Sequence, residues 1–248
     1  MKKIQFYLTP SEGKRLIAKG IAALPQIKKA MEENTVAVIS GTTNAPIAFE
    51  LLRSICREQE FDHRNFFRGL TVPAGTDVKS EFMGDVIIQK GTWLQGKTIF
   101  DVENDLGKDD IILKGANAVN LTDKEAAVLI GNPKVGTSLP ILNAVYGRRA
   151  KLYVPVGVEK RVDESISALA DFVNAPDAEG LRLLPLPGEV FTELDAISSL
   201  TGAEAVVIAG GGVLGAEGGA YYMATGTEEA LILLKDILKA VKADKSFW

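Results

Sequence analysis

The sequence predicts an α/β protein in which helices cover both faces of a mainly parallel sheet. Two observations support this prediction. Short runs of β-branched residues alternate with helical patterns along most of the 248 residues, which is typical of a parallel sheet wrapped by helices. The runs are also apolar throughout, which indicates strands that are covered on both faces.

Six apolar runs are predicted to be the core strands. In chain order they are residues 36–39, 85–88, 111–113, 151–156, 181–184 and 205–208. Apolar residues that recur every three or four positions predict the helices between and after them. Residues 46–57 form one such helix, Asp163 is expected to cap another, and Thr227 is expected to cap the last one. The stripe of that last helix consists of Leu231, Leu234, Leu238 and Val241.

The breaks between these elements are short, so we expect residues 1–248 to form a single α/β domain. Residues 61–110 include glycine-rich and polar stretches that leave room for a small excursion. No segment is long or biased enough in composition to be a flexible linker, and no internal repeat is visible.

Composition excludes several classes of function. A net charge of −4 without a basic face argues against nucleic-acid binding. No stretch approaches the roughly 18 apolar residues of a membrane-spanning helix. The single cysteine, Cys56, cannot form an internal disulfide, which is typical of a reducing compartment. We therefore expect a cytoplasmic protein without a nucleic-acid or membrane partner. The sequence does not decide whether the protein forms a homodimer.

The sequence also limits the available chemistry. With one histidine, His63, and one cysteine, a His-rich or Cys-rich metal site cannot form within one chain. A Ser-His-Asp triad would have to use His63, and no G-x-S-x-G motif accompanies it. Residues 101–105 contain three alternating acids, which are more typical of a solvated loop than of a metal site. No metal and no cofactor are predicted.

The first candidate ligand loop follows the strand at 36–39. It consists of Ser40, Gly41, Thr42, Thr43 and Asn44. A helix is expected to begin there with Asn44 as its cap, and free N–H groups at a helix start favour anions. Gly41 would let the backbone approach a ligand closely. The alternative is an ordinary strand-to-helix turn, which needs the same residue types.

The second candidate lies at the end of the strand at 111–113. It contains Lys114, Gly115 and Asn117 and, after a short helical stretch, Lys134, Gly136 and Thr137. Lys114 and Lys134 could each supply a positive charge to a phosphate or carboxylate. Taken singly, a lysine is more often a solvated surface residue.

The third candidate is the glycine-rich run at 208–219, which includes Gly211, Gly212 and Glu217. Its G-x-G-x-x-G pattern is typical of dinucleotide sites, but no later strand remains to present the ribose-binding acid. A loop that closes over a ligand is the better interpretation, with Glu217 as a candidate catalytic carboxylate.

These loops, taken in order, resemble the superfamily of ribose-5-phosphate isomerase, methylthioribose-1-phosphate isomerase, glucosamine-phosphate deaminase and the CoA transferases. Residues 40–44 resemble its phosphate loop, residues 114–120 its G-A-D-x-(I/V) signature, and residues 132–137 its N-K-I-G-T segment. The order and spacing match over about residues 36–160. The resemblance implies a Rossmann-type fold with a ligand at the carboxyl ends of the strands.

One departure bears on activity. Asn117 stands where the isomerases have an aspartate, and an amide cannot take up the proton that isomerisation moves. We therefore expect little isomerisation of ribose 5-phosphate or methylthioribose 1-phosphate unless Asp101, Asp123 or Glu217 supplies the base. Asp123 and Glu217 are the candidate catalytic residues.

Three functions remain open, and the sequence does not decide whether the protein is an enzyme. The first is a sugar-phosphate isomerase-like enzyme, and the second is a non-catalytic metabolite-binding or regulatory protein. The third is acyl transfer like that of the CoA transferases, with Glu217 as nucleophile. All three share a small anionic metabolite as the partner.

Overall fold

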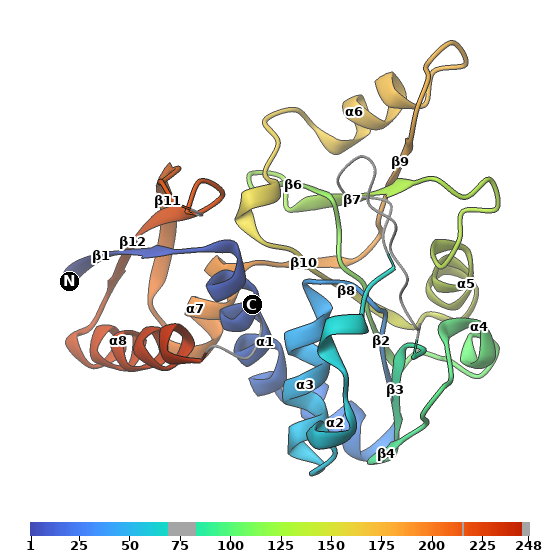
Figure 1. Ribbon diagram of the computed structural model, residues 1–248, viewed down its shortest axis with the longest axis horizontal. Helices are drawn as coiled ribbons and strands as arrows, with labels where there is room; N and C mark the ends of the chain where they lie inside the picture. Colours follow the sequence, from blue (N-terminus) through green and yellow to red (C-terminus); the bar gives the residue numbers. More distant parts are fainter. Residues whose placement is uncertain (69–82, 215, 245–248) are drawn as a thin grey trace.

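The protein is an α/β protein with three sheets, as a computed structural model shows (Figure 1). The structure describes residues 1–68, 83–214 and 216–244. The predicted α/β class is confirmed. The prediction of one mainly parallel sheet is wrong in its detail, because strands expected in that sheet form two further, antiparallel sheets.

The central sheet has six strands in the order β10-β8-β5-β2-β3-β4. Their bounds are Glu189–Phe191, Lys151–Pro155, Ile111–Leu113, Thr35–Val38, Val86–Gln89 and Thr92–Trp93. The first four strands run parallel to one another, so their carboxyl ends meet at one edge. β3 pairs with β2 in the antiparallel direction and turns at Gly91 into β4. β3 and β4 therefore form a β-hairpin.

Helices cover both faces of the central sheet. On one face lie α1 (Pro10–Ala23), α2 (Pro25–Glu33) and α3 (Asn44–Ser54), packed on side chains such as Val36 and Val38. The opposite face carries α4 (Ile99–Val102), α5 (Ser138–Leu142) and a π-helical turn at Asn143–Gly147. The alternation of side chains along each strand assigns neighbouring residues to opposite faces.

A second sheet of three strands lies beyond the carboxyl edge of the first (Figure 1). It contains β6 (Ala118–Asn120), β7 (Glu125–Ile130) and β9 (Arg182–Pro185), all antiparallel, with α6 (Ile166–Val173) packed on it. The short helix expected after Gly115 is thus a β-hairpin, and the strand expected at 181–184 belongs to this sheet. Ser165 caps α6 by accepting from the Ala168 N–H group, so the expected Asp163 cap is wrong by two residues.

The two ends of the chain form the third sheet, in the order β1-β12-β11. Its antiparallel strands are Lys2–Leu8, Ala220–Gly226 and Glu204–Gly210, and α7 (Glu193–Thr201) and α8 (Glu228–Ala243) lie against it. The strand expected at 205–208 in the parallel sheet is therefore an edge strand here. Thr227 caps α8 as predicted, and all four residues of the predicted stripe of α8 are buried.

One hydrophobic core joins the third sheet to the central one. It includes Val36 of β2, Leu16 of α1, Tyr222 of β12 and Leu234 of α8. The excursion predicted within 61–110 contains the 3₁₀ turn His63–Asn65, and another 3₁₀ turn, Glu58–Glu60, precedes it. Residues 69–82 lie outside the described residues. Among the described residues, no helix has both the length and the apolar character needed to cross a bilayer.

Candidate functional site

The candidate site lies where the parallel strands end. The loops after β2, β5 and β8 surround a cavity of about 230 Å³, which we call the loop cavity. Its described lining is Ile39–Asn44, Phe67, Arg68, Lys114–Asn117, Val128 and Lys160. Of the residues predicted as ligand-binding, it brings together residues 40–44 with Lys114, Gly115 and Asn117.

Two larger cavities adjoin the loop cavity. One of about 440 Å³, the hairpin cavity, shares Ser40, Lys114 and Asn117 with it and extends along β7 to Gly136 and Thr137. The other, of about 640 Å³, shares Thr42 and Phe67 with the loop cavity and is lined further by Lys14, His63, Arg64 and Phe66. The site is therefore a branched hollow around residues 40–44, larger than one phosphate group needs.

The loop of residues 40–44 keeps several polar groups available. The N–H groups of Asn44 and Ala45 both donate to Gly41 O, which starts α3. In the described structure, the N–H groups of Gly41, Thr42 and Thr43 have no acceptor. A Cβ atom added at Gly41 would meet nothing within 4 Å, because the backbone there faces open space.

Asn44 is not the side-chain cap that the sequence predicted. It is the first residue of α3, and its Nδ2 donates to Ile39 O at 2.8 Å and to Leu113 O at 3.0 Å. The buried side chain thereby holds the ends of β2 and β5 together. Leu113 O also accepts from the Ile39 N–H group at 2.9 Å, so the Asn44 amide adds a side-chain bond to this backbone contact between the two strand ends.

Ser40, like residues 41–43, has a polar group without a hydrogen-bond partner in the described structure. Its Oγ atom is buried and has no hydrogen-bond partner in the described structure, although the residue lines both the loop and the hairpin cavities. The Ser40 N–H group, in contrast, donates to Asp85 Oδ1 at 3.0 Å. A buried hydroxyl without a partner is costly, so this atom marks a place where a polar ligand would be stabilised.

Lys114 and Lys160 bring positive charge to the loop cavity from two strand ends. Lys114 Nζ donates to Thr137 Oγ1 at 3.2 Å, and burial lowers the pKa of this amine to about 8, with Asp85 acting against the effect and Arg68 adding to it. Lys160 Nζ donates to Ala116 O at 2.8 Å and to Thr43 Oγ1 at 3.3 Å. Burial lowers its pKa as well, while Glu159 acts in the opposite direction.

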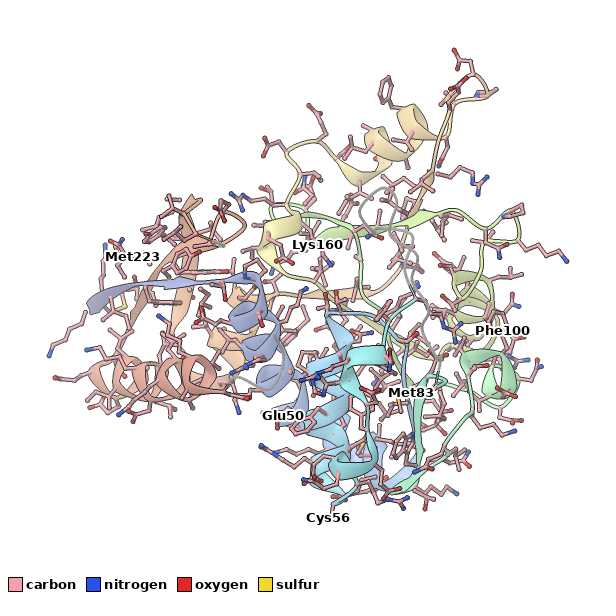
Figure 2. The ribbon with its side chains drawn as sticks, viewed as in Figure 1. Glu50, Cys56, Met83, Phe100, Lys160 and Met223 are labelled. Atoms are coloured by element: carbon pink, nitrogen blue, oxygen red, sulfur yellow. The ribbon has the colours of Figure 1, made fainter. Side chains whose placement is uncertain are left out.

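Lys160 lies on the 3₁₀ turn Val158–Lys160 after β8, above the parallel strands in Figure 2. Lys160 was not among the residues predicted from the sequence, although it lies in the loop after a parallel strand, as Lys114 does. Arg68 was not predicted either, and it forms an ion pair of 3.2 Å with the buried Asp85. Nothing in the sequence pattern around Arg68 indicates this pairing.

Asn117 has a structural role at the edge of the site. Its Oδ1 accepts from the Leu129 N–H group at 3.0 Å, and its own N–H group donates to Ala127 O at 2.8 Å. The residue therefore anchors the β6–β7 hairpin to the end of β5. This bond fixes the orientation of its amide, which lines both the loop and the hairpin cavities.

The remaining predicted residues lie outside the loop and hairpin cavities. Lys134 is exposed, and Asp123 is exposed at the turn between β6 and β7. Gly211, Gly212 and the exposed Glu217 lie on the connection between β11 and β12, in the third sheet. Gly41 and Gly115 thus share one cavity, whereas the glycine-rich loop does not line it.

The other residues considered for chemistry are also placed elsewhere. Asp101 accepts from the Thr98 N–H and hydroxyl groups in the capping box of α4. Cys56 is exposed beyond the carboxyl end of α3, at the opposite end of that helix from residues 40–44 (Figure 2). In the described part of the chain, no group of three or more His, Cys, Asp or Glu side chains could hold a metal ion.

The fold and site together define an α/β protein with a basic cavity at the carboxyl edge of its parallel strands. Comparison with known proteins found no match, either to a family model, to a curated protein or to a solved structure. The resemblance to the isomerase and CoA transferase superfamily therefore stays a prediction.

Proposed function

We propose that the protein binds a small phosphorylated or otherwise multiply charged anionic metabolite in the loop and hairpin cavities. One observation carries this proposal. Lys114, Lys160 and Arg68 line these cavities, and no carboxylate is among their described lining residues, in a chain whose net charge is −4. Basic groups that gather against the overall charge of a protein raise the local concentration of anions.

Residues 40–44 supply the hydrogen bonds that such an anion requires. Three consecutive N–H groups without described acceptors, from Gly41 to Thr43, lie at the start of the 11-residue helix α3. The hydroxyl oxygens of Thr42 and Thr43 accept from Lys14 and Lys160, respectively, which leaves each hydroxyl proton to donate to a ligand. Backbone donors, hydroxyls and the helix dipole together favour a phosphate group.

Binding receives more support than isomerisation. Asn117 cannot accept a proton, and Asp101, Asp123 and Glu217 are absent from the described lining of the loop and hairpin cavities. A general base must reach its proton directly or through one water. Acyl transfer through Glu217 is disfavoured for the same reason, since Glu217 lies on the connection of another sheet.

The proposal is tested by filling the cavity at Gly41. We expect inorganic phosphate and sugar phosphates to stabilise the wild-type protein, by about 2.7 kcal/mol when the ligand is at 100 times its Kd. Gly41→Val should fold normally, because the added side chain meets nothing within 4 Å at its Cβ. It should nevertheless lose the stabilisation, since the side chain would occupy the space in front of the N–H groups.

Gly147→Val is the matched control. Gly147 also has nothing within 4 Å of an added Cβ, but it lies in the π-helical turn after α5 and outside the described lining of the cavities. This variant should keep the ligand-induced shift in Tm. A Gly41→Val protein that binds phosphate as tightly as the wild type would contradict the proposed site.

A further inference from the structure

We infer that Lys114 is a nucleophilic lysine that forms an imine with the carbonyl group of a phosphorylated aldehyde or ketone. The inference rests on the proposed function, because the anion site would hold the phosphate while the carbonyl carbon reaches the amine. The described lining of the two cavities contains no carboxylate that could act on a carbonyl compound, and the inference gives this role to the amine of Lys114.

The position of Lys114 suits this role. It directly follows β5, it is 8% exposed, and it lines both the loop and the hairpin cavities. The hydrogen-bond acceptor of its Nζ is the neutral hydroxyl of Thr137, and among the described residues Lys114 forms no ion pair. The amine is thus buried beside open space without a direct ion pair to a described carboxylate, although the charge of Asp85 still favours its protonated form.

The surroundings increase the fraction of the amine that is neutral and therefore nucleophilic. Burial lowers the pKa of Lys114 to about 8, and the positive charge of Arg68 acts in the same direction, against Asp85. At pH 7.5 roughly a quarter of such amines are neutral, compared with roughly 0.1% for a lysine of ordinary pKa. A lysine nucleophile is activated in this way, by desolvation and a cationic neighbour.

Lys160 differs from Lys114 and is assigned to the phosphate. Two of its N–H donors are engaged by Ala116 O and Thr43 Oγ1, which directs the ammonium toward residues 40–44. Burial lowers the pKa of Lys160 too, but the negative charge of Glu159 acts in the opposite direction. These contacts assign the ammonium group of Lys160 to the bound anion and leave the amine of Lys114 for the carbonyl carbon.

Ser40 completes the arrangement on the carbonyl side. Its buried Oγ has no described hydrogen-bond partner and borders the same two cavities as Lys114. A hydroxyl in this place can donate to the carbonyl oxygen of the ligand and so favour attack at the carbon. A bound carbonyl compound would thereby satisfy the group that the protein leaves unpaired.

The covalent step balances without a further reactant. The nitrogen lone pair forms the N–C bond while the C=O π electrons move to oxygen. Both hydrogens of the neutral amine then leave with that oxygen as water, and the C=N bond remains. When the imine takes up a proton from solution, it withdraws electrons from the neighbouring carbon, which weakens the bonds of that carbon.

Reductive trapping tests the inference. Wild-type protein is incubated at pH 7.5 with dihydroxyacetone phosphate and sodium cyanoborohydride, and adducts are located by peptide mass spectrometry. We expect one dominant adduct at Lys114, formed at least tenfold faster than at any exposed lysine and suppressed by excess inorganic phosphate. Its rate should rise with pH and reach half of its maximum near pH 8.

Three variants separate the possible causes. Lys114→Met should lose the adduct, and Lys114→Arg should lose it while still binding phosphate, which excludes unfolding as the reason. Lys151→Met is the matched control, because Lys151 is exposed at the amino end of the neighbouring strand β8. It should leave trapping at Lys114 unchanged.

The outcomes distinguish this inference from the proposed function. Phosphate binding by the wild type with no preferred labelling of Lys114 would overturn the imine and leave the anion site intact. Labelling of Lys114 that phosphate does not suppress would overturn the assignment of a phosphorylated substrate. Absence of phosphate binding, measured separately by the shift in Tm, would count against the proposed function itself.

Discussion

At the scale of single residues, buried polar side chains of this protein hold strand ends in place. Asn44 joins β2 to β5 through two carbonyls, and Asn117 joins the segment between β5 and β6 to β7. Glu193 does the same between α7 and the turn after β8, where its Oε2 accepts from the Val158 N–H group at 3.0 Å. The geometry of the site depends on these bonds, although none of them was predicted.

Glu193 should make the stability of the protein depend on pH. The residue is 1% exposed, and burial raises the pKa of its carboxyl group to about 8, with Glu159 adding to the effect. The folded state therefore holds a proton that the unfolded state releases above about pH 4.5. The free energy of unfolding should fall as pH rises through this window, by at most about 1.4 kcal/mol per pH unit for one proton.

Glu193→Gln tests this prediction, because an amide mimics the protonated acid and does not titrate. Urea unfolding at pH 5, 6.5 and 8 should show a flatter decline for the variant than for the wild type. Glu204→Gln, at the exposed start of β11, should keep the wild-type slope. Equal slopes for Glu193→Gln and the wild type would mean that Glu193 is already ionised in the fold.

At the scale of elements, the close contact of α1 with α7 depends on a glycine. A Cβ atom added at Gly20 would lie 2.8 Å from Ala196 Cβ and 2.9 Å from Ala196 Cα. These distances require the two helices to move apart, because the second contact is with backbone. Gly20 therefore determines how near the third sheet, which α7 and α8 cover, lies to the helices of the central sheet.

Gly20→Ala should destabilise the protein although alanine is the better helix former. The gain in helix propensity is about 1 kcal/mol, whereas overpacking a tight core contact costs about 1–3 kcal/mol. We expect a lower Tm in thermal unfolding. Gly147→Ala, with nothing within 4 Å of the new Cβ, should not lower it, and a raised Tm for Gly20→Ala would show that the α1–α7 contact relaxes freely.

At the scale of the whole molecule, charge is unevenly distributed. The chain carries a net charge of −4, yet the described lining of the loop and hairpin cavities is basic. Anion binding should therefore be sensitive to pH through Lys114, which loses its proton as pH rises through about 8. Because a bound anion favours the protonated amine, the affinity for the anion should fall across that range.

Sulfate is the suitable probe for this prediction, since it stays divalent throughout. The sulfate-induced rise in Tm, measured at constant ionic strength, should decrease between pH 7 and pH 9. Lys114→Met should bind more weakly at pH 7 and show a smaller dependence on pH. If the wild type responds to sulfate equally at both ends of the range, Lys114 does not contribute its charge to the site.

Part of the fold and of the site could be predicted from sequence. The runs that became β2, β5 and β8, the helix α3 and the cap of α8 at Thr227 were all predicted near their observed positions. The assignment of strands to sheets was wrong for some runs, because the sequence of an apolar run does not show which other strands it pairs with. Val206 and Ile208 are 58% and 45% exposed on the edge strand β11, although their run is as apolar as that of β5.

What the sequence by itself determined is local: which segments are strands or helices, and that residues 40–44 and Lys114 follow strand ends. The tertiary structure decided which of these loops share a cavity. It brought Lys160 and Arg68 to residues 40–44 and placed Glu217 on another sheet. The physical reason is that the spacing of apolar residues indicates which faces of a segment are buried. The neighbours of a loop depend instead on strand pairing between segments far apart in the chain.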